Sequence, residues 1–128
     1  MGRRNARNIV YIHSHDTGRC VSPYGFKVAT PHVESLAREG VVFRHAYSAA
    51  PTCSPSRAAL LTSESAHAAG MLRLAHHGGS LARPERHLAR VLSARGYHTV
   101  LAGMQHVAAS ASEIGYDELL VSEELPPW

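Results

Sequence analysis

Residues 50–62 read APTCSPSRAALLT, in which a proline and an arginine stand two and four residues after a cysteine and an apolar run follows at once. Pro55 suits the first turn of a helix, because its missing N–H costs nothing there and its φ is already helical. Arg57 follows Cys53 by one helical turn, so the two side chains share a face. Free N–H groups and the positive end of the helix dipole would then face position 53. The stretch predicts a reactive side chain at a helix N-terminus; the alternative is a buried, inert cysteine.

Size and composition indicate a globular chain of about one domain, with 128 residues, 45% of them hydrophobic. We expect residues 1–7 to form a basic tail and residues 8–128 to belong to one domain. The other arginines are scattered, and the net charge is only +3, so we expect no nucleic-acid partner. No apolar run is long enough for a signal peptide or a membrane span, which predicts no membrane partner and a cytoplasmic location.

Hydrophobic patterning predicts an α/β fold with parallel strands flanked by helices. We expect strands at residues 8–13, 41–47 and 97–102, and either a strand or a helical turn at 116–121. The helices are expected at 31–40, 53–62 and 84–95, and a loop at 63–79. In the first helix, Thr30 is the predicted N-cap, and Val33, Leu36 and Ala37 have the spacing of a buried stripe. Polar residues including His15 and Asp16 follow the first strand, where ligand sites of open α/β sheets lie.

Three stretches together resemble the type I, formylglycine-dependent sulfatases. They are residues 29–37, the Cys53-x-Pro55-x-Arg57 motif, and residues 96–107 with Gly103-Met104-Gln105-His106. The resemblance covers roughly residues 7–120 and is closest to the branch that contains N-sulfoglucosamine sulfohydrolase. It implies the N-terminal part of an alkaline-phosphatase-like sandwich, with a mostly parallel central sheet flanked by helices.

The resemblance also implies a set of site residues. Cys53 would be oxidised to formylglycine by a formylglycine-generating enzyme, and Arg57 and His106 would be catalytic. His106 and Met104 would contact the substrate. A divalent metal would be held by Asp16, His15 and Cys53. The family usually binds calcium, but His15 stands where the family has an aspartate, and imidazole suits manganese or zinc better; His15 could instead support the site without touching the metal.

Two departures from the family pattern bear on activity. Met104 replaces a lysine that neutralises the sulfate, which removes a positive contact. Ser63 replaces a glycine, and a serine with positive φ would be strained there. The family's later metal ligands are not found, so we expect a fragment that is inactive alone. Of the other histidines, His13 is expected in the core or beside the site. His76 and His77 are expected in a solvated loop, with a place in the lining of the substrate cleft as the alternative. The remaining ones are expected at the surface or in packing: His32, His45, His87 and His98.

The expected function is hydrolysis of a sulfuric ester or sulfamate in a sulfated sugar or small molecule. In the family mechanism, one hydroxyl of the hydrated aldehyde attacks sulfur, and the second then expels sulfate. A phosphonate or phosphodiester hydrolase of the same superfamily is the enzymatic alternative. A truncated, non-catalytic remnant is the other.

Overall fold

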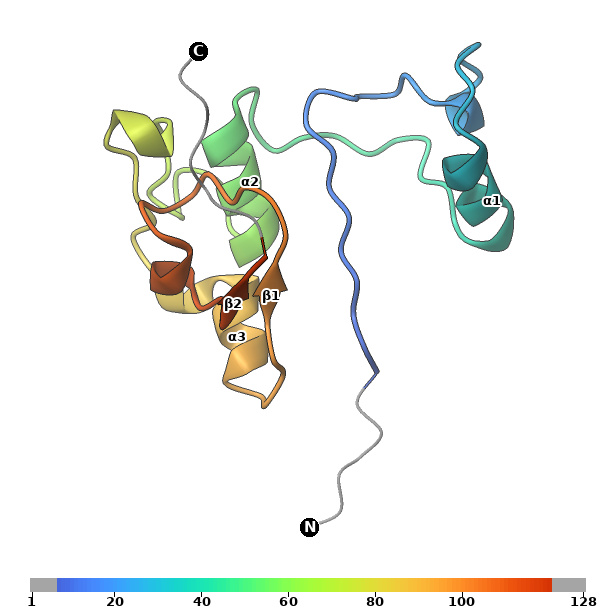
Figure 1. Ribbon diagram of the computed structural model, residues 1–128. Coiled ribbons are helices and arrows are strands. Elements are labelled where there is room, and N and C mark those ends of the chain that lie inside the picture. The colour runs from blue at the N-terminus through green and yellow to red at the C-terminus, as the bar shows by residue number, and fades with distance from the viewer. Residues whose placement is uncertain (1–6, 121–128) are drawn as a thin grey trace. The chain divides into compact units, whose positions relative to one another are not determined.

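The computed structural model describes residues 7–120, which divide into two compact units, residues 1–46 and residues 47–128 (Figure 1). The predicted basic tail lies outside the described residues except for Arg7, and so does the end of the predicted domain. None of the helices in the described part of the chain has the length and apolar character needed to cross a bilayer.

The first unit contains the 3-10 helix η1 (Ser22–Tyr24) and the helix α1 (Pro31–Glu39). The predicted helix is confirmed: Pro31 begins it, and the N–H of Gly40 donates to the Leu36 carbonyl at 2.9 Å where it ends. Thr30 precedes it but does not cap it with its side chain. Its Oγ1 instead accepts a hydrogen bond from the Ser22 N–H at 3.0 Å, which ties η1 to α1.

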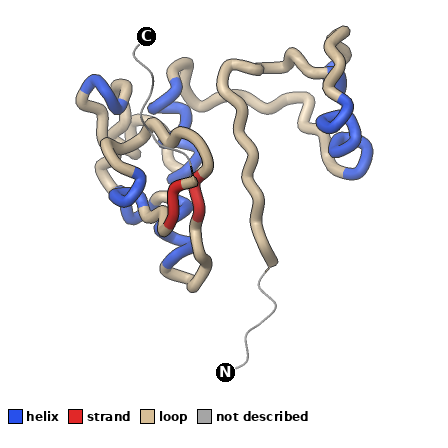
Figure 2. The backbone as a smooth tube through the Cα atoms, viewed as in Figure 1, coloured by secondary structure: helices blue, strands red, loops and turns tan. Residues whose placement is uncertain are grey.

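The predicted strands at residues 8–13 and 41–47 are wrong for this structure. Both segments are drawn as loop in Figure 2, and neither pairs with another strand. Val10 is 82% exposed and Val41 80% exposed. A β-strand needs a neighbour for its N–H and C=O groups, and the described residues of this unit supply none.

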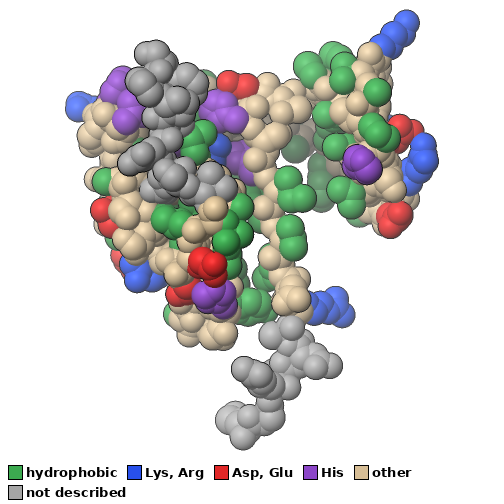
Figure 3. Space-filling model, viewed as in Figure 1, with side chains coloured by type: hydrophobic (Ala, Val, Ile, Leu, Met, Phe, Trp, Pro, Cys, Tyr) green, Lys and Arg blue, Asp and Glu red, His purple; other side chains and the backbone are tan. Residues whose placement is uncertain are grey.

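The buried stripe predicted on α1 is also wrong. The helix has no buried residue, and Leu36 is 66% exposed. Among the described elements, α1 packs against the short η1, which is too small to cover an apolar face. Hydrophobic side chains are accordingly visible on the surface of this part of the chain (Figure 3).

The second unit is richer in regular structure. Its elements are α2 (Cys53–Thr62), η2 (Ala75–His77), η3 (Pro84–Arg86), α3 (Leu88–Ser93), β1 (Val100–Leu101), η4 (Ala111–Ile114) and β2 (Glu118–Leu119). The helix at 53–62 is confirmed. The predicted helix at 84–95 is divided into η3 and α3 at His87, whose backbone is extended (φ −62°, ψ 137°) and whose Nδ1 accepts the Ala89 N–H at 3.2 Å.

The two short strands pair in parallel, with Val100 opposite Glu118 and Leu101 opposite Leu119. The prediction at 97–102 is therefore confirmed only in part, and the segment at 116–121 contains a strand. Thr99 and Asp117 hold the strands together at one end, because the Asp117 carboxylate accepts from both the N–H and the hydroxyl of Thr99 at 2.8 Å. This small parallel sheet with its helices is the α/β structure that the described residues contain.

A buried cluster lies behind the first turns of α2. It consists of Ala58, Ala69, Met71, Val107 and Ile114. Because Ala58 belongs to α2 and Val107 follows β1, the cluster fixes the helix of the cysteine motif against the loop at residues 103–107.

Candidate functional site

Cys53 is the first residue of α2, in half-buried surroundings. Thr52 before it is extended (φ −118°, ψ 156°), and its carbonyl accepts the first helical hydrogen bond from the Ser56 N–H at 3.0 Å. Pro55 lies in the first turn, as predicted. The next residues, Ser54 and Pro55, are buried. The local sequence thus places position 53 at the end of the helix where N–H groups lack intrahelical partners.

Arg57 connects this helix to a segment 47 residues further along the chain. Its side chain is only 9% exposed, and Nη1 donates to the Met104 carbonyl oxygen at 3.0 Å. The sequence allowed the guanidinium to fold back toward position 53; the structure gives it this contact with the Met104 backbone. This contact brings three predicted site residues to one region of the second unit: Arg57, Met104 and His106.

Ser54 makes a second connection from the same turn. It is fully buried, and its Oγ accepts the N–H of Ala75 at 3.0 Å. Ala75 begins η2, whose next two residues are His76 and His77, with ring centroids 4.4 Å apart. The prediction of a loop at 63–79 thus misses a short helical turn that is fixed to the cysteine motif.

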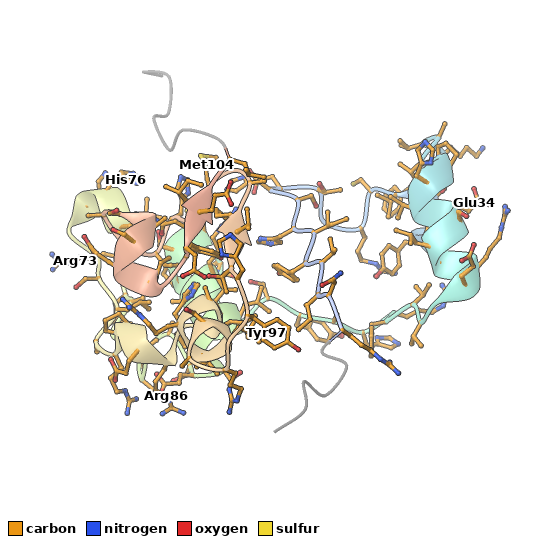
Figure 4. The ribbon with its side chains drawn as sticks, turned by 60° about the horizontal axis from the view of Figure 1, so that its bottom comes forward. Glu34, Arg73, His76, Arg86, Tyr97 and Met104 are labelled. Carbon is orange, nitrogen blue, oxygen red and sulfur yellow. The ribbon has the colours of Figure 1, made fainter. Side chains whose placement is uncertain are left out.

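A pocket of about 260 Å³ lies between these two connections. Its lining residues are Ala75, His76, Met104, Gln105, His106, Ala108 and Ala109. Figure 4 shows the labelled His76 and Met104 toward the same side of the second unit, opposite Arg86. His76, expected in a solvated loop, is therefore part of the pocket wall together with Met104 and His106. Imidazole groups and neutral side chains make up this lining, so a bound anion would meet hydrogen-bond donors from histidine rather than a lysine ammonium.

Backbone conformation sets apart three non-glycine residues. Within residues 7–120, φ is positive at Asp16 (55°), Ser63 (58°) and His106 (56°). The sequence left the sign of φ at Ser63 open, and the structure gives this serine the left-handed conformation at the end of α2. A non-glycine residue in this region costs of the order of 1–3 kcal/mol and persists where its surroundings hold it. All three are positions that the motif comparison had singled out, two as site residues.

The predicted metal ligands fall in both units. In the first unit, His15 Nδ1 lies 3.0 Å from Asp16 Oδ2, and the Asp16 side chain is largely exposed. Cys53 belongs to the second unit. Across the described residues, no group of three or more His, Cys, Asp or Glu side chains could hold a metal ion. Asp16 and His15 fit a cation as two donors of a larger set, one a carboxylate oxygen and one an imidazole nitrogen.

Two buried polar residues of this region were not anticipated as functional. Ser54 lies inside the motif, but a serine beside Pro55 indicates only the start of a helix and not a buried hydrogen bond. Gln105 is 5% exposed, and its amide makes three hydrogen bonds to the backbone of residues 107 and 108. The sequence could have indicated a role for Gln105, because this residue directly precedes the predicted site residue His106.

His87 is the group with the most strongly perturbed acidity. It is fully buried, and its ring meets Tyr116 edge-on with centroids 5.6 Å apart. Burial lowers the pKa of His87 from 6.5 to about 4, and the Arg90 charge acts in the same direction, against the nearby Ile114 carbonyl. His87 is therefore a buried, neutral side chain that caps the N-terminus of α3. This agrees with the expectation that it lies at the surface or in packing.

Comparison with known proteins places these features in a family. A sequence model of the sulfatase family matches residues 7–123. The chain is 38% identical over 109 residues to human N-sulphoglucosamine sulphohydrolase, covering 82% of this chain and 22% of that protein. It is 42% identical over 99 residues to mouse steryl-sulfatase, covering 68% and 15%. With an arylsulfatase of Clostridium perfringens it shares 32% identity over 107 residues, covering 83% and 22%.

The chain thus spans about a fifth of the length of these relatives. Most of its own length takes part in the match, including the cysteine motif and the loop at 103–107. The chain belongs to the sulfatase family.

Proposed function

We propose that the chain forms the N-terminal part of a formylglycine-dependent sulfatase. The reaction is hydrolysis of a sulfuric ester or sulfamate, with a sulfated carbohydrate or other sulfated small molecule as substrate. Residues 8–128 would then belong to one catalytic domain, an alkaline-phosphatase-like sandwich with a mostly parallel central sheet. Residues 1–7 would be a basic tail, and the protein would be cytoplasmic.

The hydrogen bond from Arg57 to the Met104 carbonyl is the observation that supports this proposal most directly. It joins the cysteine motif to the matched stretch at residues 96–107, across 47 residues of sequence, at a wall of the pocket. Two family motifs that meet in space in this way are consistent with one catalytic site.

The proposal gives a role to each of three site residues in the second unit: Arg57, His106 and Met104. Arg57 keeps positive charge beside position 53, and its other N–H groups can donate to the modified side chain. His106 donates to a sulfuryl oxygen, because imidazole N–H is a good donor to an anion. Met104 contacts the substrate through an uncharged thioether, so electrostatic stabilisation from this wall is weaker than a lysine would give.

A divalent cation is part of the proposal, with calcium as the family preference and manganese as the alternative favoured by His15. Asp16, His15 and position 53 would hold it, together with ligands from other parts of the protein. When bound, such a cation supplies positive charge that neutralises sulfate and makes a nearby hydroxyl more acidic. Asp16 contributes a hard anionic oxygen, and His15 either a softer nitrogen or a hydrogen bond to that oxygen.

Conversion of Cys53 is the chemical step that this chain would undergo. It is a two-electron oxidation by the formylglycine-generating enzyme: the Cβ–Sγ bond breaks, a C=O bond forms and the sulfur leaves as hydrogen sulfide. Dioxygen accepts these two electrons together with two more from a thiol reductant, which becomes a disulfide, and so the oxygen that does not enter the aldehyde leaves as water. A thiol attacking sulfur would stall as a thiosulfate-type adduct, whereas the second hydroxyl of a hydrated aldehyde can expel sulfate.

The test is co-expression of the chain with a formylglycine-generating enzyme, followed by mass spectrometry of the peptide that contains Cys53. We expect the aldehyde mass in the native sequence and an unmodified thiol in the Arg57→Ala variant. Cys20 is the control, since it lies outside the motif and should stay a thiol. An unchanged thiol at position 53 of the native chain would contradict the proposal.

One observation favours a second candidate, a non-catalytic remnant. Met104 lines the pocket where the family has a lysine, and the pocket wall carries no side chain with a fixed positive charge. Assays of the full-length protein with sulfate esters and with phosphate esters separate the candidates. Turnover of sulfate esters supports the sulfatase, and turnover of phosphate esters supports the phosphonate or phosphodiester hydrolase. If neither ester is turned over, the remnant is supported. We expect the 128-residue chain alone to show no sulfatase turnover, because ligands from the rest of the protein are required.

A further inference from the structure

Gln105 has a side-chain amide that is fully engaged with the backbone just beyond His106. Its Oε1 accepts the N–H of Val107 at 2.6 Å and the N–H of Ala108 at 2.8 Å. Its Nε2 donates to the Ala108 carbonyl at 2.7 Å. The side chain is 5% exposed, so these bonds are shielded from water. One side-chain amide thus bonds to the two residues that follow His106, so that its contacts span His106 in the sequence.

His106 is the residue that these contacts hold in an unusual conformation. Its φ of 56° lies in the left-handed region, which L-residues avoid unless neighbouring contacts enforce it. The chain on both sides is fixed: the Met104 carbonyl accepts from buried Arg57, and Val107 is fully buried in the core cluster with Ala58. Between these anchors, the Gln105 amide determines the path of the backbone through His106.

We propose that Gln105 is a positioning residue, which holds His106 in its left-handed conformation and so sets the imidazole in the wall of the pocket. This inference rests on the proposed role of His106 as a contact to sulfate. Gln105 itself acts through His106 and needs no contact with the reacting atoms.

The chemistry of the contact explains why a primary amide is suited to it. Two N–H groups need an acceptor, and one carbonyl needs a donor, at the two ends of the same short side chain. A carboxylate can serve the N–H groups but would repel the Ala108 carbonyl. An aliphatic side chain would leave all three groups without a side-chain partner in a buried setting.

The experiment compares the native chain with Gln105→Ala and uses two readouts. Amide hydrogen exchange of Val107 and Ala108 measures the backbone contact, and long-range ¹H–¹⁵N spectra of histidine rings measure the setting of His106. His32, which lies on α1 in the first unit, is the internal reference. Glu113→Ala, at an exposed position of η4, is the control substitution.

In Gln105→Ala we expect exchange at Val107 to rise about tenfold, with a shift of the His106 ring signals and none at His32. Faster exchange with unchanged His106 ring signals would overturn the inference, since the glutamine would then only stiffen the backbone. Unchanged exchange would overturn it too.

A second variant keeps the test decisive if Gln105→Ala does not fold. Gln105→Glu keeps both acceptor contacts and replaces the donor contact to the Ala108 carbonyl by a repulsive one, so we expect a smaller shift of the same His106 signals than in Gln105→Ala. Failure of both variants to fold would overturn the inference, because the amide would then be needed by the whole unit. Neither readout depends on Cys53 conversion or on turnover, so the inference and the proposed function can fail separately.

Discussion

The two units of the chain contain similar apolar runs, but only in the second unit does such a run pair as a strand. In the first unit, the run at residues 9–12 is exposed and is not a strand, although its composition is that of a buried strand. In the second, Val100 and Leu101 pair with β2 next to a buried core. The difference teaches that a β-branched run becomes a strand only where a neighbouring strand and a packing layer are within reach of the same unit.

Buried polar groups follow the same division. In the described part of the chain, the buried polar side chains belong to the second unit: Ser54, Arg57, Thr62, His87, Thr99 and Gln105. Glu64 is nearly buried as well, and its Oε1 lies 2.6 Å from a guanidinium nitrogen of both Arg83 and Arg86. Since buried hydrogen bonds hold side chains at fixed distances, we expect the precise part of the site geometry to reside in this unit.

The largest expected effect contrasts core truncation in the two units. Met71 is fully buried in the core cluster, so Met71→Ala should lower the free energy of unfolding of the second unit by about 2–5 kcal/mol. The matched change in the first unit, Leu36→Ala, removes an exposed side chain and should alter it by less than about 0.5 kcal/mol. Urea unfolding with a probe in each unit measures both. Equal losses would show that the two units bury apolar surface alike.

The next largest effect is the dependence of stability on pH through His87. The unfolded chain protonates this histidine near pH 6.5, and the folded chain only near its lowered pKa of about 4. Between these values the unfolded state binds more protons, so the stability present at pH 7 falls as the pH is lowered. This difference in pKa should lower the free energy of unfolding by about 3 kcal/mol between pH 7 and pH 4.

The measurement is urea unfolding of the second unit at pH 7, 5.5 and 4. His87→Asn keeps a helix-capping side chain and should remove most of this pH dependence. His32→Asn, on α1, should leave it as it is. If His87→Asn keeps the native pH profile, the histidine is not neutral in the fold.

The smallest effect uses the same substitution with opposite signs in the two units. Ser63 has a φ of 58°, so Ser63→Gly should relieve strain and stabilise the second unit by about 0.5–1 kcal/mol. Ser35 is inside α1, so Ser35→Gly should lower the helical content of the first unit. Unfolding midpoints and the circular dichroism signal at 222 nm test the pair. A loss of stability in Ser63→Gly would mean that the serine side chain contributes more than the strain costs.

Much of the second unit could be predicted from local sequence. The helix at 53–62 was predicted because Pro55 suits the first helical turn and the alanine–leucine run that follows favours helix. In the first unit, α1 was predicted in the same way from Thr30, Pro31 and Gly40. The division of residues 84–95 at His87 was not predicted, because periodicity does not reveal that a histidine turns extended to cap the next helix. A solvated loop was preferred over a cleft-lining role for His76 for a similar reason: the position of His76 in the pocket wall depends on the buried hydroxyl of Ser54, 22 residues earlier.

Local sequence was enough to indicate the family and the helix of the cysteine motif, because motifs and helix signals are local. It also indicated the candidate residues Cys53, Arg57, Met104 and His106. Which of these residues meet depends on the folded chain, through the hydrogen bond from Arg57 to Met104 and the core cluster that contains Ala58 and Val107. The tertiary structure also decided that residues 8–13 and 41–47 are not strands here, because strand formation depends on a partner that local sequence cannot specify.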